Sequence, residues 1–516
     1  MPAKYDTILV LDFGGQYCHL IGRRIREHGV YSEIVPHDIS PEEVKALNGK
    51  FNVKGLIFSG GPSSVYEPNA PKLHPRILEV NLPILGLCYG HQLLAQIVNG
   101  KVEPATCKEY GIAQVAIDKP VGILEGLSEK EQVWMSHGDT VMAPPPEFEA
   151  LAHTDNCPVA AFRHKSKPIY GLQWHPEVIH TEHGMRMLQN FIFQVCKAQA
   201  NWQMEDLIGK MVKELQTETS GARAIIGLSG GIDSSVATAL AAKALGEKLT
   251  AVYVDHGFMR EGETESIRET FEKFDINFIV ADAHERFYSK LYGVTEPETK
   301  RKIMGEEFIR VFEEIAAQSG AEYLIQGTIY PDRIESGASK NSDKIKSHHN
   351  VAGLPEKIKF KKILEPLRDL YKDEVRKVAR MLELPKELVN RQPFPGPGLA
   401  VRIIGPLTEE KIRIAKQSDK IIREEISKCD FADGLWQYFS VVTDTKATGV
   451  KGDARAYGYV VAVRAMESRE AMTASFAKIP YPVLEHISTR ITNEVPQVTR
   501  VVYDITHKPP ATIEWE

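Results

Sequence analysis

Three short segments in the first third of the sequence carry residues suited to nucleophilic chemistry at a carbonyl carbon. The segment GLCYGH (86–91) places Cys88 between a predicted strand and a predicted helix, with a glycine two residues away on each side. G-x-C-x-G is the thiol form of the nucleophile elbow, in which small flanking residues permit a sharp strand-to-helix turn. The helix N-terminus favours the thiolate, which is the reactive form of cysteine. A cysteine after a strand is by itself more often a small buried hydrophobe, so the other two segments decide the interpretation.

The segment GLQWHPE (171–177) supplies His175 and Glu177, two residues apart. On an extended segment, side chains at i and i+2 point the same way, so the glutamate can orient the imidazole while the imidazole takes the thiol proton. The segment SGGP (59–62) supplies glycines whose N–H groups can approach an oxyanion closely. We therefore predict a triad of Cys88, His175 and Glu177, with an oxyanion hole formed by the N–H groups of Gly60 and Tyr89.

A fourth segment, SGGIDSS (229–235), lies between an apolar strand and an alanine-rich helix. It is not a Walker A loop, because GxxxxGK[ST] is absent. Its glycines and hydroxyls can still form an anion-binding nest at a helix N-terminus. An ordinary helix start is the simpler alternative, since Ser and Asp are good N-caps, but the density of such residues favours a phosphate site. The predicted phosphate-binding residues are Ser229, Gly230, Gly231, Ile232, Asp233, Ser234 and Ser235.

These segments stand at the ends of apolar runs that alternate with helical patterns. TILVLDF (7–13), GLIFSGG (55–61) and PILGLCYG (83–90) are examples, and the same pattern starts again at residue 223. Strands that alternate with helices predict parallel sheets with helices on both faces and ligand sites at the carboxyl ends of the strands. The proline- and glycine-rich segment RQPFPGPG (391–398) marks a boundary. We expect two doubly wound, mainly parallel-sheet α/β domains, followed by a smaller α+β C-terminal domain.

The composition is that of an ordinary globular protein. The chain has 516 residues, of which 43% are hydrophobic and 26% charged, and this length predicts about three domains. The net charge of -6 gives no global basic field that would attract nucleic acid. No apolar run reaches the length of a membrane span and the N-terminal residues resemble a strand, so we expect no membrane association. Six scattered cysteines without metal-ligand spacing favour a reducing compartment, and we expect a cytosolic protein.

The elbow, the His-Pro-Glu segment and the SGGP turn, in this order, resemble the triad-type (class I) glutamine amidotransferases over residues 5–196. The resemblance implies glutamine as the substrate, a glutamyl-thioester on Cys88 and the release of ammonia. It also implies a glutamine pocket that includes Gln92, Ser136 and His137.

The SGGIDSS string resembles the pyrophosphate loop of the ATP pyrophosphatases. This resemblance implies that ATP is split between its α and β phosphates, giving an adenylyl intermediate and pyrophosphate. Mg²⁺ bound with ATP would neutralise the developing charge, and no organic prosthetic group is expected. Asp233 is a candidate partner of the metal, either as a direct ligand or through water.

The remainder of the chain resembles the glutamine-hydrolysing GMP synthetase family. The segments that carry this resemblance are KRKI (300–303), RQPFPGPG (391–398) and YDITHKPPATIEWE (503–516). The resemblance implies that ATP, XMP, glutamine and water give AMP, diphosphate, GMP and glutamate. It implies a homodimer formed through the C-terminal domain, with higher oligomers left open. The XMP contacts that it implies are Arg301, Asp453, Lys508 and Glu514.

The resemblance also divides the chain into an amidotransferase domain (5–196), an ATP pyrophosphatase domain (197–391) and a dimerisation and XMP-site domain (392–516). The polar, basic segment 336–362 is either a solvated surface loop or a lid that closes over ATP and XMP. Two residues depart from the family pattern: His256 replaces an Asn of many relatives, and Gln392 replaces a His of bacterial members.

Three alternatives compete with this interpretation. A glutamine-dependent NAD synthetase would carry a nitrilase-type amidotransferase with a Glu-Lys-Cys set, which the elbow and the His-Pro-Glu segment argue against. An asparagine synthetase would need an N-terminal cysteine nucleophile, and residue 2 is Pro. A regulatory nucleotide-binding protein with an inactive amidotransferase would be expected to lose part of the triad, which is complete here.

Overall fold

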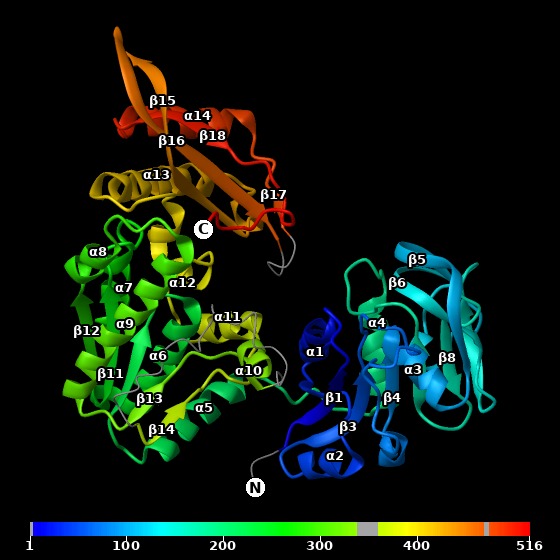
Figure 1. Cartoon of the computed structure of the whole chain (residues 1–516). Coiled ribbons are helices and arrows are strands. Elements are labelled where there is room, and N and C mark those ends of the chain that lie inside the picture. Colours follow the sequence, from blue (N-terminus) through cyan, green and yellow to red (C-terminus); the bar gives the residue numbers. More distant parts are fainter. Residues whose placement is uncertain (1–3, 338–359, 469–473) are drawn as a thin grey trace. The chain divides into compact units, whose positions relative to one another are not determined.

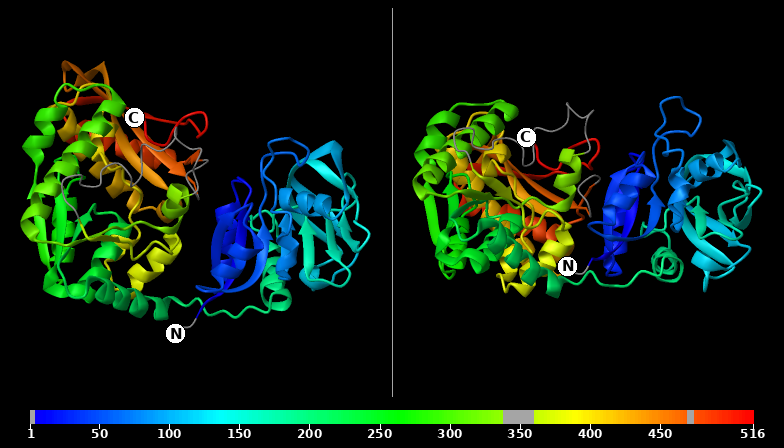
Figure 2. Two further views of the ribbon diagram at one scale, coloured as in Figure 1. Left: turned by 60° about the horizontal axis from the view of Figure 1, so that its bottom comes forward. Right: turned by 90° about the horizontal axis from the view of Figure 1, so that it is seen from below.

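The computed structural model of the chain describes residues 4–337, 360–468 and 474–516 (Figure 1). Most of the predicted loop at 336–362 therefore lies outside the described residues. The chain forms two compact units, Met1–Gln203 and Met204–Glu516, which Figure 2 shows from two further directions. Within the described ranges, no helix combines the length and the apolar character that a bilayer crossing requires.

The first unit is built on a nine-stranded sheet with the strand order β2-β1-β3-β4-β9-β8-β7-β5-β6. Pairing is parallel from β2 to β9 and antiparallel from β9 to β6. Strand β1 is buried over most of its length, as expected for a parallel strand that is covered on both faces. The strands are β1 (Asp6–Asp12), β2 (Tyr31–Pro36), β3 (Asn52–Phe58), β4 (Ile84–Leu87), β5 (Lys101–Ile117), β6 (Lys130–Ala143), β7 (Phe148–His153), β8 (Ala161–His164) and β9 (Ile169–Leu172).

Helices cover both faces of the parallel half of this sheet. Parallel crossovers are right-handed, so α1, which leads from β1 out to β2, and α2, which leads back to β3, lie on opposite faces. A capping box at Ser40 begins α2. The helices are α1 (Cys18–Glu27), α2 (Pro41–Leu47), α3 (Tyr89–Ile97), α4 (Gly184–Gln189) and the π-helix η3 (Asn190–Val195), with short 3₁₀ turns η1 (Ile77–Val80) and η2 (Gly122–Leu124).

The second unit contains a five-stranded, all-parallel sheet with the order β12-β11-β10-β13-β14. The chain moves from β10 toward one edge and later returns to the other side of β10. The carboxyl end of β10 is therefore the topological switch point, where open α/β sheets bind ligands. The strands are β10 (Ala224–Leu228), β11 (Leu249–Asp255), β12 (Asn277–Asp282), β13 (Tyr323–Ile325) and β14 (Lys362–Leu364).

The crossover rule again assigns the helices of this sheet to two faces, because β10→β11 and β12→β13 run in opposite directions along it. The long helix α9 contacts β10 and β11, while α5 and α11 pack on α6. These helices are α5 (Met204–Thr219), α6 (Ile232–Leu245), α7 (Glu263–Phe271), α8 (His284–Leu291), α9 (Pro297–Ser319), α10 (Tyr330–Gly337), α11 (Lys372–Met381) and α12 (Lys386–Val389), with the 3₁₀ turns η4 (Gly246–Lys248) and η5 (Gly398–Arg402).

The C-terminal part of the second unit is a four-stranded sheet built on a long antiparallel hairpin. Strands β15 (Gln437–Lys451) and β16 (Ala454–Glu467) form the hairpin, and β18 (Val498–Tyr503) runs parallel to β16. Two helices pack on this sheet, α13 against β15 and α14 against β18. The remaining elements are α13 (Glu409–Ser427), the 3₁₀ turn η6 (Ala432–Gly434), β17 (Ser475–Phe476) and α14 (Tyr481–Glu494).

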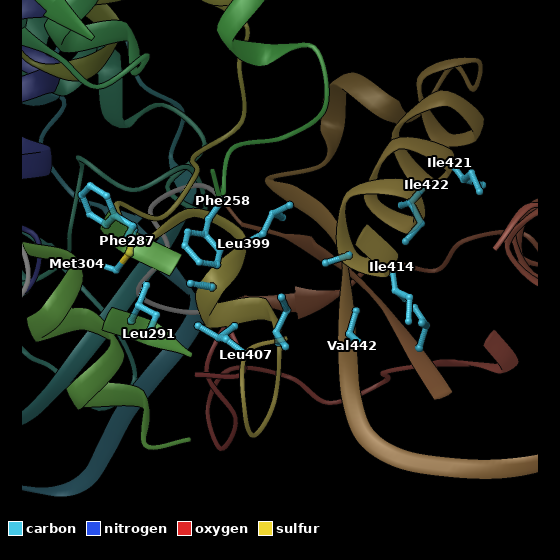
Figure 3. Close-up of a cluster of buried hydrophobic side chains, with 14 of the residues drawn as sticks. Phe258, Phe287, Leu291, Met304, Leu399, Leu407, Ile414, Ile421, Ile422 and Val442 are labelled. Carbon is cyan, nitrogen blue, oxygen red and sulfur yellow. The ribbon is translucent and has the colours of Figure 1, made fainter. Parts of the chain in front are cut away.

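One hydrophobic core runs through the second unit. It includes Phe258 and Phe287 beside the five-stranded sheet, Leu399 of η5, and Ile414 of α13. Figure 3 shows these side chains in one continuous cluster. The predicted fold class is confirmed: the chain combines two large parallel-rich sheets, each with helices, and a smaller, mainly antiparallel C-terminal sheet.

Candidate active sites

Cys88 stands alone between the end of β4 and the first residue of α3, and its backbone is bent to fit there. Its φ is 51° and its ψ is -107°, and such a conformation costs a non-glycine residue on the order of 1–3 kcal/mol. A Cβ on Gly86 would lie 2.5 Å from the carbonyl oxygen of Gly90, and a Cβ on Gly90 would overlap Phe58. Close backbone contacts thus require both glycines, and the turn has the form that the elbow motif predicts.

His175 and Glu177 form a buried pair just beyond the end of β9. The Nδ1 atom of His175 lies 2.7 Å from Oε1 of Glu177, and the glutamate side chain is wholly buried. Burial by itself would lower the pKa of His175. The charges of Glu177 and Cys88, and hydrogen bonds with both, raise the pKa of His175 well above its usual value. The three predicted triad residues are therefore electrostatically coupled, with the imidazole between the thiol and the carboxylate.

A hydroxyl group that the sequence did not reveal holds His175 in place. The Thr181 hydroxyl donates to the carbonyl oxygen of His175 at 2.6 Å and accepts from the amide of Trp134 at 3.1 Å. The amide of His175 donates in turn to the carbonyl oxygen of Trp134 at 3.1 Å. This brace was missed because a threonine in a loop carries no distinctive signal.

Gly60 lies directly against the Cys–His pair. A Cβ on Gly60 would come within 3.0 Å of Cε1 of His175 and 3.7 Å of Cβ of Cys88. The neighbouring Ser59 hydroxyl fixes this turn, since it accepts from the amide of Phe13 and donates to the carbonyl oxygen of Gly60. Tyr89 is the first residue of α3, so its amide has no acceptor within the helix. The structure thus brings both predicted oxyanion-hole residues beside the cysteine.

The three residues predicted for the glutamine pocket lie close to Cys88 or to one another. The carbonyl oxygen of Ser136 accepts from the Cys88 thiol at 3.3 Å. Gln92 donates to the carbonyl oxygen of Asp139, and His137 contacts that same oxygen through Nδ1 at 3.0 Å. Burial lowers the pKa of His137 although a glutamate contacts its Nε2.

Two further partners, the partly buried Glu109 and the buried Gln173, complete this network and were not predicted from the sequence. Glu109 contacts the Nε2 atom of His137 at 3.0 Å and accepts from the hydroxyl of Thr154. Gln173 accepts from the side-chain amide of Gln92 at 3.1 Å. Gln92 and His137 therefore form hydrogen bonds with other residues of the protein, and these bonds fix the wall of the pocket.

The segment 229–235 joins β10 to α6 at the switch point of the second sheet. Gly230 has a φ of 74°, which favours glycine, and the Ser229 hydroxyl accepts from the amide of Gly231 at 3.3 Å. The Ser234 hydroxyl lies 3.0 Å from that of Ser229 and donates to the carbonyl oxygen of Gly231. These contacts curl the loop around the N-terminus of α6, and an anion would meet free helix amides there.

Two cations from distant parts of the sequence reach this loop. Lys372, the first residue of α11, places its Nζ 2.5 Å from Oδ2 of Asp233. Arg391 donates to the carbonyl oxygen of Gly230 and forms an ion pair with Glu263. The second carboxylate oxygen of Asp233 is buried and has no hydrogen-bond partner within the part of the chain that the structure describes. Sequence analysis assigned neither cation to this site, since a lone Lys or Arg near a helix end is common.

Buried cations hold the C-terminal segment, and these too were missed. Arg402 is fully buried and forms a bidentate pair with Glu514, at 3.0 and 2.8 Å. Arg464 is also fully buried and donates to the carbonyl oxygens of Thr506 and Thr512. Residues 503–516, called the tail below, are therefore an ordered part of the second unit. The available signal was the position of each arginine within an apolar run, which implies a buried partner.

Three of the predicted XMP contacts, Arg301, Lys508 and Glu514, lie at this clamped tail. Arg301, on α9, donates to the backbone oxygen of Glu516, and its neighbour Lys300 pairs with the Glu516 carboxylate. Burial lowers the pKa of Lys300 and raises the pKa of Glu516, so desolvation weighs on both partners. Lys508 pairs through its backbone with Ala474. Arg301 thus contacts the same short segment to which Lys508 and Glu514 belong.

Asp453 lies elsewhere in the unit. It stands at the exposed turn between β15 and β16, opposite the end of β16 that pairs with β17 near the tail. Since β16 has 14 residues, the two ends of the strand are roughly 45 Å apart. Within one chain the structure does not bring Asp453 together with the residues that surround the tail.

No cluster of three or more His, Cys, Asp or Glu side chains suited to a metal ion occurs in residues 4–337, 360–468 and 474–516. Mg²⁺ is commonly bound by one or two carboxylates together with substrate phosphates, so an ion that binds with a nucleotide does not require such a cluster.

Comparison with known proteins agrees with this division into two sites. Residues 9–195 match the family "Glutamine amidotransferase class-I", residues 203–309 match "NAD synthase", and residues 424–515 match "GMP synthase C terminal domain". The fold and the sites thus define a glutamine amidotransferase joined to an ATP-using synthetase of the NAD synthase type.

Curated relatives identify the family. The chain is 53% identical to a protein of Geobacillus kaustophilus named "GMP synthase [glutamine-hydrolyzing]", over 99% of both chains. It is 52% identical to a protein of the same name from Caldicellulosiruptor saccharolyticus, over 99% of this chain and 100% of the relative. The solved structure of a putative GMP synthase protein from Thermoplasma acidophilum is 35% identical over 38% of this chain and 96% of its own, with a TM-score of 0.34.

The chain belongs to the glutamine-hydrolysing GMP synthase family. It is a ligase that aminates XMP to GMP in an ATP-dependent reaction, with glutamine as the nitrogen donor. The function predicted from the sequence is confirmed.

Proposed function

We propose that Cys88, His175 and Glu177 release the ammonia that this reaction consumes. His175 takes the thiol proton, and the Cys88 thiolate attacks the amide carbon of glutamine. The C–N bond then breaks, His175 gives its proton to the leaving ammonia, and a glutamyl-thioester remains on Cys88. Water, deprotonated by the same imidazole, hydrolyses the thioester to glutamate. The observation that carries this proposal is the strained Cys88 beside a His175–Glu177 pair at 2.7 Å.

The N–H groups of Gly60 and Tyr89 would hold the oxyanion of each tetrahedral intermediate. Preorganised donors of this kind are worth several kcal/mol, about 10²- to 10³-fold in rate for a single donor. Gln92, Ser136 and His137 would shape the pocket for glutamine, because Gln92 and His137 share the carbonyl oxygen of Asp139 and the Ser136 carbonyl oxygen accepts from Cys88.

In the second unit, residues Ser229 to Ser235 would hold the phosphates of ATP. ATP is cleaved between its α and β phosphates as the XMP oxygen attacks the α phosphate, so pyrophosphate leaves and an adenylyl-XMP intermediate forms. Ammonia then displaces AMP to give GMP. Activation is needed because a purine carbonyl oxygen is a poor leaving group. What supports this role is that the Ser229 and Ser234 hydroxyls lie 3.0 Å apart at the N-terminus of α6, where helix amides favour an anion.

The residues present fit a magnesium ion that is bound together with ATP. Asp233 has one carboxylate oxygen that is buried without a hydrogen bond among the described residues, at the mouth of the phosphate loop. Asp233 would hold the ion, directly or through water, and the ion would supply charge neutralisation for the leaving pyrophosphate. Lys372 fixes the orientation of Asp233 through its other oxygen.

We infer that XMP binds beside the clamped tail, with Arg301, Lys508 and Glu514 as contacts and Asp453 contributed by a partner subunit. The hairpin that carries Asp453 has exposed apolar side chains, with Val450 77% and Tyr457 72% exposed, which supports contact with a second copy. The protein would then be a homodimer formed through its C-terminal domain, residues 392–516. Residues 5–196 would be the amidotransferase domain and residues 197–391 the ATP pyrophosphatase domain.

A cytosolic location agrees with the six cysteines, which are all free thiols.

One assay tests the proposed chemistry. The protein is incubated with ATP, Mg²⁺ and glutamine, and either XMP or nicotinate adenine dinucleotide is added. We expect amination of XMP with one AMP and one pyrophosphate per GMP, and no aminated product from the dinucleotide. Amination of the dinucleotide would contradict the assignment of the acceptor.

A further inference from the structure

The ring of Phe394 is a contact shared by three arginines. The guanidinium carbon of Arg260 lies 4.5 Å from the ring centroid, that of Arg402 lies 5.1 Å away, and that of Arg391 lies 5.8 Å away. Distances within about 6 Å mark cation–π contacts, which are stronger when the partners are desolvated. Phe394 belongs to the segment RQPFPGPG (391–398), called the proline loop below.

One of these arginines reaches the proposed ATP site. Arg391 donates to the carbonyl oxygen of Gly230 in the phosphate loop and pairs with Glu263 at the start of α7. A Cβ on Gly230 would lie 2.8 Å from the Nη1 atom of Arg391, so the guanidinium packs closely on the loop. Any movement of the phosphate loop on binding ATP would therefore move Arg391 or break its contact with the loop.

Another of these arginines reaches the proposed XMP site. Arg402 is fully buried, forms the bidentate pair with Glu514, and also lies 3.9 Å from the centroid of Phe439. A second connection runs beside it, because Gln437 donates both to the carbonyl oxygen of Pro393 and to Glu514, at 2.7 and 3.4 Å. The proline loop is thus tied to the tail by two separate routes.

Of the three arginines, Arg260 has the fewest hydrogen bonds to described residues. It is 8% exposed, and its Nε and Nη2 atoms make no hydrogen bond to any residue in the described ranges. Among those residues Arg260 forms an ion pair with the buried Asp419, at 3.4 Å. Asp419 also forms ion pairs with Arg402 and Arg423. A cation buried with incomplete hydrogen bonding is stabilised by other nearby groups, and here these are the Asp419 carboxylate and the face of Phe394.

We propose that Phe394 is a positioning residue that couples the ATP phosphate loop to the XMP-binding tail, through Arg391 on one side and Arg402 on the other. When ATP orders the phosphate loop, Arg391 is held in place and the ring is held with it. The ring then fixes Arg402 and the carboxylate of Glu514. Each nucleotide thereby favours the arrangement that binds the other, which is a reciprocal coupling. This proposal rests on the proposed function of the phosphate loop and of Glu514.

The coupling is measured by calorimetry on the full chain with Mg²⁺. The Kd of XMP is determined with and without saturating α,β-methylene-ATP, which resists cleavage between the α and β phosphates. In the unmodified chain we expect the ATP analogue to tighten XMP binding at least fivefold. In Phe394→Leu we expect this factor to fall by at least about twofold, toward a value of one, because the ring no longer offers a cation–π contact. The Kd of each ligand alone should change less than the factor does.

Three variants make the result specific. Phe394→Tyr keeps the ring face and should keep the coupling factor within about twofold of that of the unmodified chain. Arg391→Lys keeps a charge but loses the planar fork, and it should lower the coupling factor as Phe394→Leu does. Phe431→Leu is the matched control, because Phe431 is also partly buried against the same core and has no described guanidinium over its ring.

Two outcomes would overturn the proposal: a coupling factor of one in the unmodified chain, or unchanged coupling in both Phe394→Leu and Arg391→Lys. If Phe394→Leu does not fold, Arg391→Lys and Phe394→Tyr still decide. Glu514→Gln and Ser234→Ala, measured in the same way, test the proposed function separately. If these two variants bind XMP and ATP as tightly as the unmodified chain, the sites themselves are misplaced, whatever Phe394 does.

Discussion

The proposed glutaminase site of the first unit is formed mainly by backbone geometry, whereas the proposed synthetase site of the second unit is formed mainly by charged side chains. Cys88 is placed by a strained turn between β4 and α3, and the partners of that turn are glycines in tight backbone contact. The phosphate loop is held instead by Arg391 and Lys372, which lie more than a hundred residues further along the chain.

This difference follows from what each site must do. A thiolate nucleophile needs one fixed geometry, and backbone contacts in a packed core supply it at all times. A site for two nucleotides must open and close, and ion pairs between loops and helices can rearrange more readily than packed backbone. We therefore expect conservative changes to be severe in the first site, and changes in the second site to act mainly on binding and coupling.

The largest effect should come from Cys88→Ala. Removing the nucleophile should lower glutamine-dependent GMP formation by about 10⁴-fold or more, while GMP formation from ammonium should stay within about twofold. Both rates are measured by GMP release under otherwise equal conditions. Loss of both activities in a folded variant would break the separation between the two sites.

Glu177→Gln should act next most strongly and should also change the pH dependence. The carboxylate orients His175, and its loss should lower glutaminase activity by about 10²- to 10⁴-fold. The charge of Glu177 helps to raise the pKa of His175. In the variant the pKa of His175 should therefore be lower, and the imidazolium that donates the proton should be lost at a lower pH. The alkaline limb of the glutaminase pH profile should therefore move to lower pH.

Glu109→Gln is the matched control for this experiment, since Glu109 and His137 form another close Glu–His pair in the same unit, at 3.0 Å. Its alkaline limb should stay in place. An equal displacement of the limb in both variants would show that it does not report His175.

Gly60→Ala should lower glutaminase activity by about 10- to 100-fold. The added methyl would come within 3.0 Å of Cε1 of His175, so the imidazole or the turn must move by a few tenths of an ångström. Ammonium-dependent synthesis should not change, and kcat for glutamine should fall more than KM rises. An unaltered kcat in this variant would contradict the assignment of Gly60 to the oxyanion hole.

Glu514→Gln should act on binding rather than on the chemical step. It weakens a bidentate charged pair with Arg402 and replaces the proposed carboxylate acceptor for XMP by a neutral amide, so KM for XMP should rise by about tenfold or more. Glutamine hydrolysis measured without XMP should stay the same. If KM for ATP rises and KM for XMP does not, Glu514 belongs to the other nucleotide.

The smallest effect concerns His91, which is buried under the elbow. Burial lowers its pKa to about 3, so the folded chain keeps it neutral where the unfolded chain, with a pKa near 6.5, binds a proton. Stability is therefore lost as the pH falls from about 6.5 toward 3. His91→Gln should make the free energy of unfolding depend less on pH in this window, by up to about 1.4 kcal/mol per pH unit. Denaturant unfolding between pH 4 and 7 measures the difference, and parallel curves would contradict it.

The elements that could be predicted from the sequence are those whose signals are local. Glycines around Cys88, the two-residue spacing of His175 and Glu177, and the hydroxyl-rich loop after β10 each state their geometry within a few residues. The fold class followed from the alternation of strands and helices, because that alternation is also local.

The parts that could not be predicted depend on pairs that are distant in sequence. Arg402 and Glu514 are 112 residues apart, and Arg391 lies 161 residues from Gly230. An arginine inside an apolar run indicates that a buried partner exists, but not which carboxylate it is. The Glu109–His137 pair, 28 residues apart, was missed for the same reason, whereas the Thr181 brace was missed because a threonine in a loop carries no distinctive signal.

The product ratio with XMP tests the central claim most directly, namely that the second unit activates the purine oxygen by adenylation. Purified protein is given ATP, Mg²⁺, XMP and ammonium, and the nucleotide and phosphate products are quantified together. We predict one AMP and one pyrophosphate for each GMP, with no ADP. Release of ADP and inorganic phosphate in their place would contradict the account.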